Sequence, residues 1–410
     1  MQTFDVIIVG GGVGGSTLAA NLAAAGLSVE VLEREPVFLD RVRGEWIAHW
    51  GVAEARQLGV YEPLLASGGH HLRRSVIFDE LLAPAQAAAD VLALDDLHPA
   101  APGPLCMEHV AMQNTLLRHA RSCGAKVRRG VSALKVEAGT SPTVHFMHDS
   151  VAFTHGCKLL IGADGRSSSV RRQLGLALDE QPVDHLISGL LVSEAEAWPA
   201  DLQAFGKAGE VMYLIFPQGQ GKVRLYVEYA LKDRGRYSGA QGTRNLLAAF
   251  NADSLPGGEA LSAATPSGPC KAYPSQHARL EHPYAPGAVL VGDAAGYTDP
   301  ILGQGLSLTL RDVRMVRDIL LASEDWSVSA FAPYGLARAE ATRRIGQSTR
   351  FAARLFTRFD AEDLAARARA MQRMAAQPEL KGLLASAFVG PEVMPAELFT
   401  DAFHEALFAQ

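Results

Sequence analysis

The sequence predicts an α/β fold, in which a Rossmann-like three-layer domain carries an inserted antiparallel-sheet domain and is followed by a helical C-terminal tail. Three observations support this prediction. A short apolar strand runs into a glycine-rich turn near the N-terminus, two later apolar strands end in an acidic residue beside glycine, and the stretch between those two is rich in alternating, β-branched and aromatic residues. The length of 410 residues is enough for two or three domains.

The composition is typical of a folded soluble protein. Hydrophobic residues make up 48% of the chain and charged residues 20%, which excludes a mostly disordered chain. The net charge of −6 argues against nucleic acid as a partner. The four cysteines show no CxxC spacing, which predicts no metal site and favours a reducing cytoplasm. No apolar run is long enough to span a membrane, and Asp5 in the first strand argues against a signal peptide.

The first motif joins a strand, a glycine cluster, a helix and an acid. Phe4–Val9 reads as a buried strand, and the glycines of residues 10–15 follow it. A helix is expected over Ser16–Ala25, and a second strand over Ser28–Leu32 ends next to Glu33. This order is typical of a dinucleotide-binding unit.

Each glycine of the GxGxxG pattern has a separate physical reason. Gly10 permits the tight turn, Gly12 lets the backbone approach a pyrophosphate, and Gly15 lets helix and strand pack closely. The free amides at the helix N-terminus favour phosphate, and Glu33 can accept hydrogen bonds from a ribose diol. The dinucleotide contacts expected from this motif are Gly10, Gly12, Val13, Gly14, Gly15 and Glu33.

Two later strands end in the same way. The strand within Lys158–Arg171 ends in Asp164-Gly165, and the strand within Ala288–Gly296 ends in Gly292-Asp293. A helix is expected from about Gly305 to Leu321. Both acids therefore lie at the carboxyl edge of the sheet, where doubly wound folds bind ligands.

The three motifs in this order resemble the FAD-dependent aromatic hydroxylase superfamily, the class A flavoprotein monooxygenases typified by para-hydroxybenzoate hydroxylase. The resemblance is anchored at both ends of roughly the first 345 residues and is weak between them. It implies bound FAD, NADPH or NADH as a transient reductant, and O2. It further implies hydroxylation of a small aromatic or heteroaromatic substrate through a flavin 4a-hydroperoxide.

The resemblance also implies roles for individual residues. Glu33 and Arg34 would flank the adenosine ribose, Arg43 would approach the diphosphate, and Asp293 would bind the ribityl chain. Where family members often carry an arginine before the helix of residues 112–122, this chain has Glu108 and His109. The remaining implied FAD contacts are Gln113, Asp164, Gly292, Pro300, Gly303, Gln304 and Gly305.

The turn before the last of these helices also has a physical interpretation of its own. A helix that begins at Gly303-Gln304-Gly305 directs its positive end at the preceding segment, where it would stabilise the negative pyrimidine ring of a reduced flavin. The chain has no second GxGxxG pattern, so NAD(P)H is expected to bind transiently in a surface cleft.

The substrate side is expected to be an antiparallel sheet that covers the flavin ring. Its predicted strands are Leu186–Val192, Glu210–Phe216, Val223–Ala230 and Pro269–Tyr273, with a hairpin turn at residues 219–221. The predicted domains are a discontinuous FAD domain (1–70, 105–180 and 280–345), a substrate domain (71–104 and 181–279) and a helical region (346–410). The helical tail is compatible with a homodimer.

Candidate catalytic residues come from the same sheet and from the segment after Arg43. Arg224, Tyr226 and Glu228 share one strand face, which is either a pocket wall or a solvated outer face. Arg224 would bind a carboxylate or phenolate. His49, Tyr226 and Glu228 are candidate bases for a phenolic substrate.

Other functions remain open at this point. A flavin-dependent reductase of the geranylgeranyl reductase type shares the GDAAG of residues 292–296, and Tyr213–Pro217 partly matches its YxWxFP pattern. A flavin halogenase is disfavoured, because Trp46 and Trp50 lack the expected WxWxIP context. A flavin-binding scaffold without catalytic activity is a further alternative.

Overall fold

The first sheet has a parallel centre, as the sequence predicts. The computed structural model describes residues 1–42 and 44–409. The sheet runs in the order β20 (Tyr284–Ala285), β21 (Ala288–Leu290), β11 (Val151–Gly162), β1 (Gln2–Val9), β2 (Val29–Glu33) and β8 (Lys126–Arg129). All neighbours pair in parallel except β20 and β21. Both of its faces are covered by other elements, so the apolar residues of β1 are buried on both sides.

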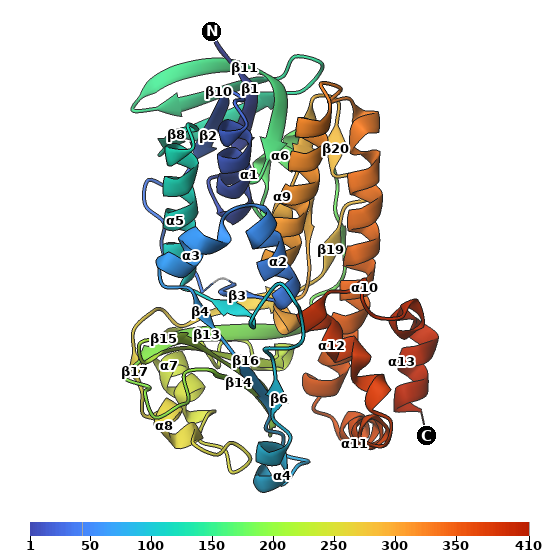
Figure 1. Ribbon diagram of the computed structural model, residues 1–410. Helices are drawn as coiled ribbons and strands as arrows, with labels where there is room; N and C mark the ends of the chain where they lie inside the picture. The colour runs from blue at the N-terminus through green and yellow to red at the C-terminus, as the bar shows by residue number, and fades with distance from the viewer. Residues whose placement is uncertain (43, 410) are drawn as a thin grey trace.

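Three helices lie on one face of this sheet. α1 (Val13–Ala24) packs between α5 (His109–Ser122) and α9 (Gly305–Ala322), as Figure 1 shows in its upper half. The other face is covered by β9 (Ser132–Glu137) and β10 (Thr143–His148), with the short α6 (Ser169–Gln173). The α/β fold class is therefore confirmed. α1 begins earlier than expected, because its glycines at 14 and 15 take helical geometry.

The second sheet lies below the first in Figure 1. Its order is β17 (Thr265–Pro266), β13 (His185–Ser193), β16 (Lys222–Ala230), β15 (Val211–Gly219), β14 (Leu202–Ala208), β5 (Arg74–Ile77) and β6 (Leu92–Ala93), and β18 (Lys271–Ser275) also pairs with β13. The predicted hairpin joins β15 to β16, with positive φ at all three turn residues. The prediction missed β14 and β5, which pair in parallel with each other.

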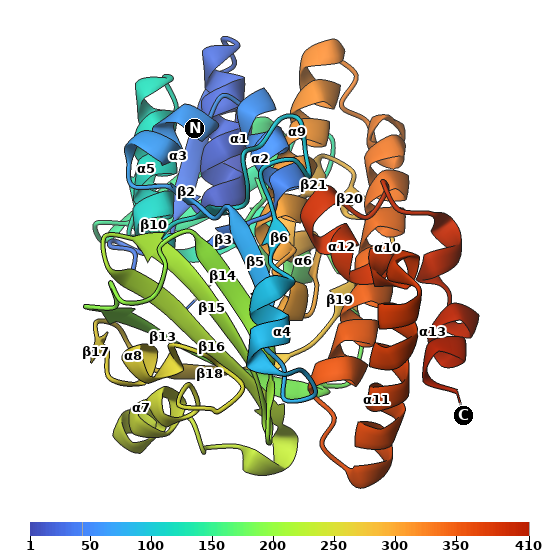
Figure 2. The same ribbon diagram turned by 60° about the horizontal axis from the view of Figure 1, so that its bottom comes forward.

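The C-terminal helices pack on the second sheet. α10 (Ala332–Phe356), α11 (Ala361–Ala376), α12 (Gly382–Val389) and α13 (Asp401–Phe408) lie beside its strands in Figure 2. Ile187, Met212 and Leu214 of the sheet share one apolar cluster with Phe351 and Phe356 of α10. The opposite sheet face is covered by α7 (Gly239–Ala248) and α8 (Gly258–Ser262). The tail therefore supports the second sheet directly.

Shorter elements complete the described fold. They are α2 (His49–Gln57), α3 (Tyr61–Ala66), α4 (Pro84–Ala89), β3 (Trp46–Ile47), β4 (His70–His71), β7 (Leu105–Cys106), β12 (Asp179–Glu180), β19 (Ala278–Arg279) and β22 (Gly296–Tyr297), with single turns η1 (Leu231–Asp233), η2 (Gly292–Ala295), η3 (Pro300–Leu302), η4 (Val328–Phe331), η5 (Pro378–Lys381) and η6 (Ala396–Phe399). Within the described residues, no helix has both the length and the apolar character needed to cross a bilayer.

A buried ion pair joins the tail to the segment after β5. The guanidinium of Arg367 on α11 contacts the carboxylate of Asp79, and both side chains are at most 1% exposed. Lys207 of β14 pairs with the neighbouring Glu80 at 2.6 Å. These contacts fix α11 against the second sheet.

We predict that Arg367→Leu destabilises the protein by about 3 kcal/mol, because the substitution leaves the carboxylate of Asp79 buried without its cation. Urea unfolding followed by circular dichroism measures this change. Arg350→Leu is the control: Arg350 pairs with Asp401 on the surface, so its loss changes the free energy of unfolding by less than about 1 kcal/mol. Equal effects of the two substitutions would contradict the prediction.

Candidate functional site

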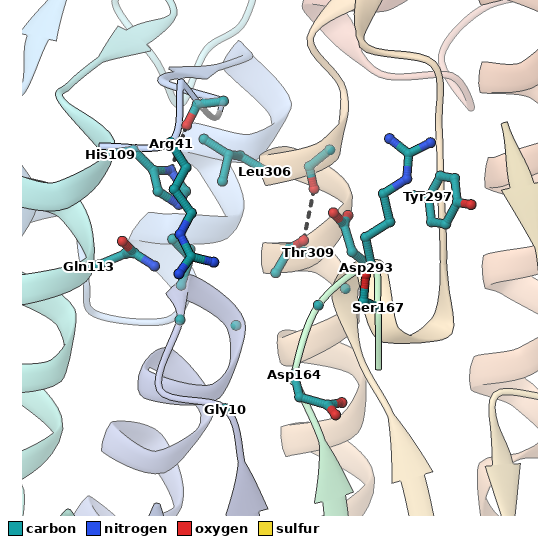
Figure 3. A pocket seen from close by; sticks show the side chains of 18 of the residues that line it. Gly10, Arg41, His109, Gln113, Asp164, Ser167, Asp293, Tyr297, Leu306 and Thr309 are labelled. Carbon is teal, nitrogen blue, oxygen red and sulfur yellow. Dashed lines mark hydrogen bonds between the residues drawn. The ribbon is translucent and has the colours of Figure 1, made fainter. Parts of the chain in front are cut away.

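A cavity of about 680 Å³ lies between the first and second sheets. Its walls come from the three glycine-containing motifs, the second sheet and the segment between β2 and β3. Figure 3 shows Arg41, His109 and Gln113 on one side of this cavity and Asp293, Tyr297 and Thr309 on the other. The strand ends of all three glycine-containing motifs therefore line the same cavity.

The first glycine motif shows which of its glycines the protein itself requires. A Cβ on Gly10 would lie 2.3 Å from the carbonyl oxygen of Ala163, and one on Gly15 would lie 1.9 Å from the carbonyl oxygen of Gly10. A Cβ on Gly12 would meet nothing closer than the side-chain nitrogen of Gln113, at 4.0 Å. Gly10 and Gly15 are thus dictated by packing, whereas the space beside Gly12 belongs to the cavity.

Glu33 is held at the end of β2 by backbone donors. Its Oε2 accepts a hydrogen bond from Gly11 N at 2.6 Å, and its Oε1 accepts one from Glu35 N at 2.7 Å. The side chain lines the cavity beside the glycine turn, together with the exposed Arg34. This placement suits a ribose diol that enters along α1.

The second motif is a helix cap. Asp164 accepts hydrogen bonds from Ser169 N at 2.6 Å and from Val170 N at 3.1 Å, and so caps the N-terminus of α6. Arg171, on the same helix, donates to the carbonyl oxygen of Ala294 at 3.0 Å. Asp164 lines the cavity as expected. The hydrogen bond from Arg171 connects the turn after Asp164 to the third motif.

A buried ion pair shapes the third motif. Gly292 N donates to Asp312 at 2.9 Å, and Arg338 donates to the same carboxylate at 2.9 Å. Arg338 also donates to the carbonyl oxygens of Gly292 and Gly296, at 3.1 and 2.9 Å. Burial raises the pKa of Asp312, and the facing guanidinium opposes that rise. Sequence reasoning missed both charged residues, because neither belongs to a recognisable motif.

The turn before α9 presents its backbone to the cavity. Asp299 accepts a hydrogen bond from Ile301 N at 3.0 Å and caps η3. Gly303 has φ +65°, and a Cβ there would lie 2.9 Å from the ring of Trp46. Pro300, Gly303 and Gly305 line the cavity.

The side chain of Gln304 points away from the cavity and bonds to neighbouring elements. Its Oε1 accepts a hydrogen bond from Trp50 Nε1 at 3.1 Å, and its Nε2 donates to the carbonyl oxygen of Ala387 on α12 at 3.1 Å. The side chains of Gln304 and Trp50 therefore bond to each other, and neither is among the residues that line the cavity. Through the contact with Ala387, the C-terminal helix α12 supports this turn on the side away from the cavity.

The part of the cavity next to the second sheet is mostly apolar. Its walls include Trp46, Ile187, Leu214, Phe216 and Tyr226. Burial raises the pKa of Tyr226 far above its usual value, so its hydroxyl stays neutral at neutral pH. A neutral phenol can orient a substrate by hydrogen bonding, but it is a poor base.

Arg224 lies in the cavity wall, where two carboxylates already pair with its guanidinium. It donates to both carboxylate oxygens of Glu45, at 2.6 and 2.8 Å, and to Asp40 at 3.1 Å. Burial opposes the charge of Arg224, but these neighbours together raise its pKa. Glu45 also accepts a hydrogen bond from Gln218. The side chain of Arg224 is 1% exposed, which excludes a solvated outer face for this strand.

Two predicted catalytic side chains lie outside the cavity walls. His49 is fully buried, and its Nε2 is 2.9 Å from the carbonyl oxygen of Leu94. Burial lowers the pKa of His49 to about 4. Glu228 is on the same strand face as Arg224 and Tyr226, but its carboxylate is 3.0 Å from Nε2 of His185. Sequence spacing gives the face of a side chain but not how far along the strand the cavity extends.

Arg43, the predicted diphosphate contact, lies outside the described residues. Cavity-lining residues that match the sequence predictions are Gly10, Gly12, Val13, Gly14, Glu33, Arg34, Gln113, Asp164, Gly292, Asp293, Pro300, Gly303 and Gly305. Among residues 1–42 and 44–409, no three His, Cys, Asp or Glu side chains gather closely enough to hold a metal ion.

The cavity has the features that an FAD molecule requires. The space beside Gly12 admits a pyrophosphate at the N-terminus of α1, Glu33 meets the ribose position, and the η3 turn faces the opposite end. Comparison with known proteins agrees with this geometry. The model of the FAD binding domain family matches residues 3–331.

Curated relatives have several activities. The chain is 27% identical over 357 residues to 3-demethoxyubiquinol 3-hydroxylase of Escherichia coli, covering 85% of this chain and 87% of that protein. It is 25% identical over 331 residues to mitochondrial squalene epoxidase 2 of Arabidopsis thaliana and spans only 54% of that protein, with 77% of this chain aligned. It is 26% identical to digeranylgeranylglycerophospholipid reductase 1 of Methanococcoides burtonii over 324 residues, covering 74% of this chain and 71% of that protein.

Solved structures share the fold. The p-nitrophenol 4-monooxygenase PnpA of Pseudomonas putida superposes with a TM-score of 0.76 at 19% identity, with 100% of both chains covered. The flavin-dependent halogenase CmlS superposes with a TM-score of 0.76 at 16% identity, covering 99% of this chain and 76% of that one. At these identities the likeness extends to the fold alone.

We predict different outcomes for two glycine substitutions. Gly12→Ala adds a methyl group to open space, so the unfolding free energy of the apoprotein changes by less than about 1 kcal/mol. The same methyl group occupies the pyrophosphate position, so FAD binds at least about tenfold more weakly.

Gly15→Ala forces a Cβ into the Gly10 carbonyl oxygen and destabilises the apoprotein by about 3 kcal/mol. Urea unfolding and flavin fluorescence titration measure both effects; full FAD affinity in Gly12→Ala would refute the site.

Proposed function

The chain belongs to the FAD binding domain family, and from this premise we propose that it is a single-component monooxygenase that uses NADPH or NADH and O2 to hydroxylate a small aromatic or heteroaromatic molecule. The bound FAD would supply the redox chemistry, by accepting a hydride from the nicotinamide and by activating O2 when reduced. The observation that carries the proposal is the apolar, sheet-covered end of the cavity directly beside the η3 turn.

This enclosed end supports an oxygen-transfer reaction because it keeps water away from the reacting atoms. Ile187 and Leu214 of the sheet face Ile301 of the η3 turn within one apolar cluster. Trp46 and Phe216 pack with ring centroids 6.2 Å apart and close the adjacent wall. A planar ring that enters this space would stack among aromatic and aliphatic side chains, which favours an aromatic substrate.

The turn before α9 would stabilise the charge of the reduced cofactor. The backbone amides around Gly303 and Gly305 stand at the N-terminus of an 18-residue helix. The positive end of that helix favours a negative charge on the pyrimidine edge of the flavin. Asp293 and Gln113 line the cavity between this turn and the first glycine motif, where the ribityl chain and the ring edge would lie.

The charge balance of the wall favours a neutral substrate. Arg224 carries one positive charge, and Glu45 and Asp40 both contact it through their carboxylates. A substrate carboxylate at this position would add a third negative charge beside the carboxylates of Glu45 and Asp40. We therefore assign Arg224 the role of holding Asp40 and Glu45, and we assign substrate orientation to the neutral hydroxyl of Tyr226.

A reductase remains the second candidate. The relative from Methanococcoides burtonii is named as a reductase of an isoprenoid lipid, and an apolar cavity also suits such a substrate. The two functions differ in their need for O2, because saturation of a double bond consumes reductant without it.

The test is to load the protein with FAD and follow NADH and NADPH oxidation with candidate phenols, indoles and quinolones. A monooxygenase shows substrate-stimulated oxidation together with O2 uptake and a hydroxylated product. Product formation under anaerobic conditions would reject the monooxygenase and support the reductase. A strong preference for benzoate-type anions over their neutral analogues would contradict the proposed substrate class.

We predict that Leu214→Trp blocks the substrate end of the cavity. The larger side chain fills space opposite Tyr226, its cross-strand partner, so the KM for the aromatic substrate rises at least about tenfold while FAD content is kept. Leu214→Met, which conserves volume, is the matched control and keeps KM within about threefold. Steady-state kinetics with flavin quantified by absorbance measure the change; an unchanged KM in Leu214→Trp would place the substrate elsewhere.

A further inference from the structure

A cluster of buried charges lies where the second sheet, the η3 turn and the C-terminal helices meet. Its centre is His185, the first residue of β13, which is fully buried. Glu228 approaches it from β16, Asp299 from the cap of η3, and Asp184 from the residue before β13. Neither the glycine motifs nor the substrate wall includes His185.

The imidazole contacts a carboxylate on each side. Its Nε2 lies 3.0 Å from the Oε2 of Glu228 and 3.7 Å from the Oδ1 of Asp299, and its Nδ1 lies 3.3 Å from the Oδ2 of Asp184. The side chains of His185 and Glu228 are both 0% exposed. The contact between His185 and Glu228 does not have hydrogen-bond alignment, so the attraction between them is chiefly that of opposite charges.

Two arginines complete the charged surroundings. Arg358, which follows α10, pairs with Asp184 at 2.5 Å at the edge of the cluster. Arg166 also acts electrostatically on Asp299. Burial opposes the charge on His185, but Asp299, Glu228 and Asp184 outweigh it and raise the pKa of His185 to about 10. The imidazole is therefore a cation at neutral pH, and its Nε2 lies 3.0 Å from the carboxylate of Glu228.

Asp299 connects this cluster to the cavity. The Oδ1 atom that faces His185 is the same atom that accepts the hydrogen bond from Ile301 N. Ile301 and Pro300 line the cavity, and Gly303 closes the turn by donating its N–H to the carbonyl oxygen of Pro300 at 2.8 Å. A change in the position of the Asp299 carboxylate would therefore move the backbone that faces the ligand.

We propose that His185 is a positioning residue for the FAD site: as an imidazolium held between Glu228 and Asp299, it keeps the η3 turn fixed between the substrate sheet and the flavin. Without this cation, the carboxylates of Glu228 and Asp299 would repel each other in a medium of low dielectric constant. The inference rests on the assignment of the η3 turn to the flavin.

The test compares FAD dissociation constants of the wild type and His185→Gln between pH 6 and pH 8.5, with the visible circular dichroism of the bound flavin as a second readout. Wild-type affinity stays flat, because His185 remains protonated across this range. In His185→Gln, burial still raises the pKa of both carboxylates and the opposing imidazolium is gone, so a lower pH favours a shared proton between them. As the pH rises both ionise, the turn loosens, and the dissociation constant increases at least about tenfold.

Two further variants separate positioning from ordinary stabilisation. His185→Gln with Glu228→Gln removes one positive and one negative charge together, so it restores near wild-type FAD affinity and a flat pH profile. His155→Gln breaks another buried His–Glu pair, with Glu30, at a distance from the cavity. It lowers the unfolding free energy but leaves the FAD dissociation constant and the flavin circular dichroism unchanged at every pH.

The inference is overturned by any of three results: wild-type affinity in His185→Gln at pH 8.5, a loss that does not depend on pH, or no recovery in the double variant. Since the readout is FAD affinity, it is independent of turnover. If the wild type binds FAD but shows no substrate-stimulated O2 uptake, the proposed monooxygenase function is refuted, whereas the proposed role of His185 is not affected.

Discussion

The ion pair between Arg338 and Asp312 is the interaction on which the rest of the site depends. Both side chains are about 2% exposed, and between them they satisfy the N–H of Gly292 and the carbonyl oxygens of Gly292 and Gly296. A turn with three buried backbone groups would be unstable without these partners. The pair connects α9 and α10 to the end of β21, so it fixes where α9 begins. The η3 turn and one wall of the cavity follow from that position.

The remaining walls come from parts of the chain that have no motif. The second sheet supplies an apolar face, and the C-terminal helices cover that face beyond the cavity through Phe351 and Phe356. Gln304 links the η3 turn to α12, and Asp299 links it to the second sheet through His185. The backbone of the η3 turn is therefore connected both to the C-terminal helices and to the second sheet. The helical tail supports the cavity in this way although none of the described residues that line the cavity belongs to it.

Much of the cofactor end could be predicted because its constraints are local. A Cβ on Gly15 would meet the carbonyl oxygen of Gly10 within the same strand–turn–helix unit, and Glu33, at the end of the next strand, accepts a hydrogen bond from Gly11. The alternation of β16 likewise predicts that Arg224, Tyr226 and Glu228 share a face. It could not predict that Tyr226 lines the cavity whereas Glu228 meets His185, because that depends on where η3 crosses the sheet. The strand β14 was missed, since Gly206 and the buried Lys207 weaken its apolar pattern.

The sequence by itself determined the α/β class, the three ordered cofactor motifs and the existence of a second, largely antiparallel sheet, since short-range backbone geometry and residue periodicity encode each of them. The tertiary structure alone decided the electrostatics. It showed that Arg224 is already paired with Glu45 and Asp40, that His49 is fully buried outside the cavity walls, and that His185 faces two carboxylates from distant segments. The physical reason is that charge, burial and pKa depend on which side chains meet in space, and these partners are separated by between 43 and 184 residues along the chain.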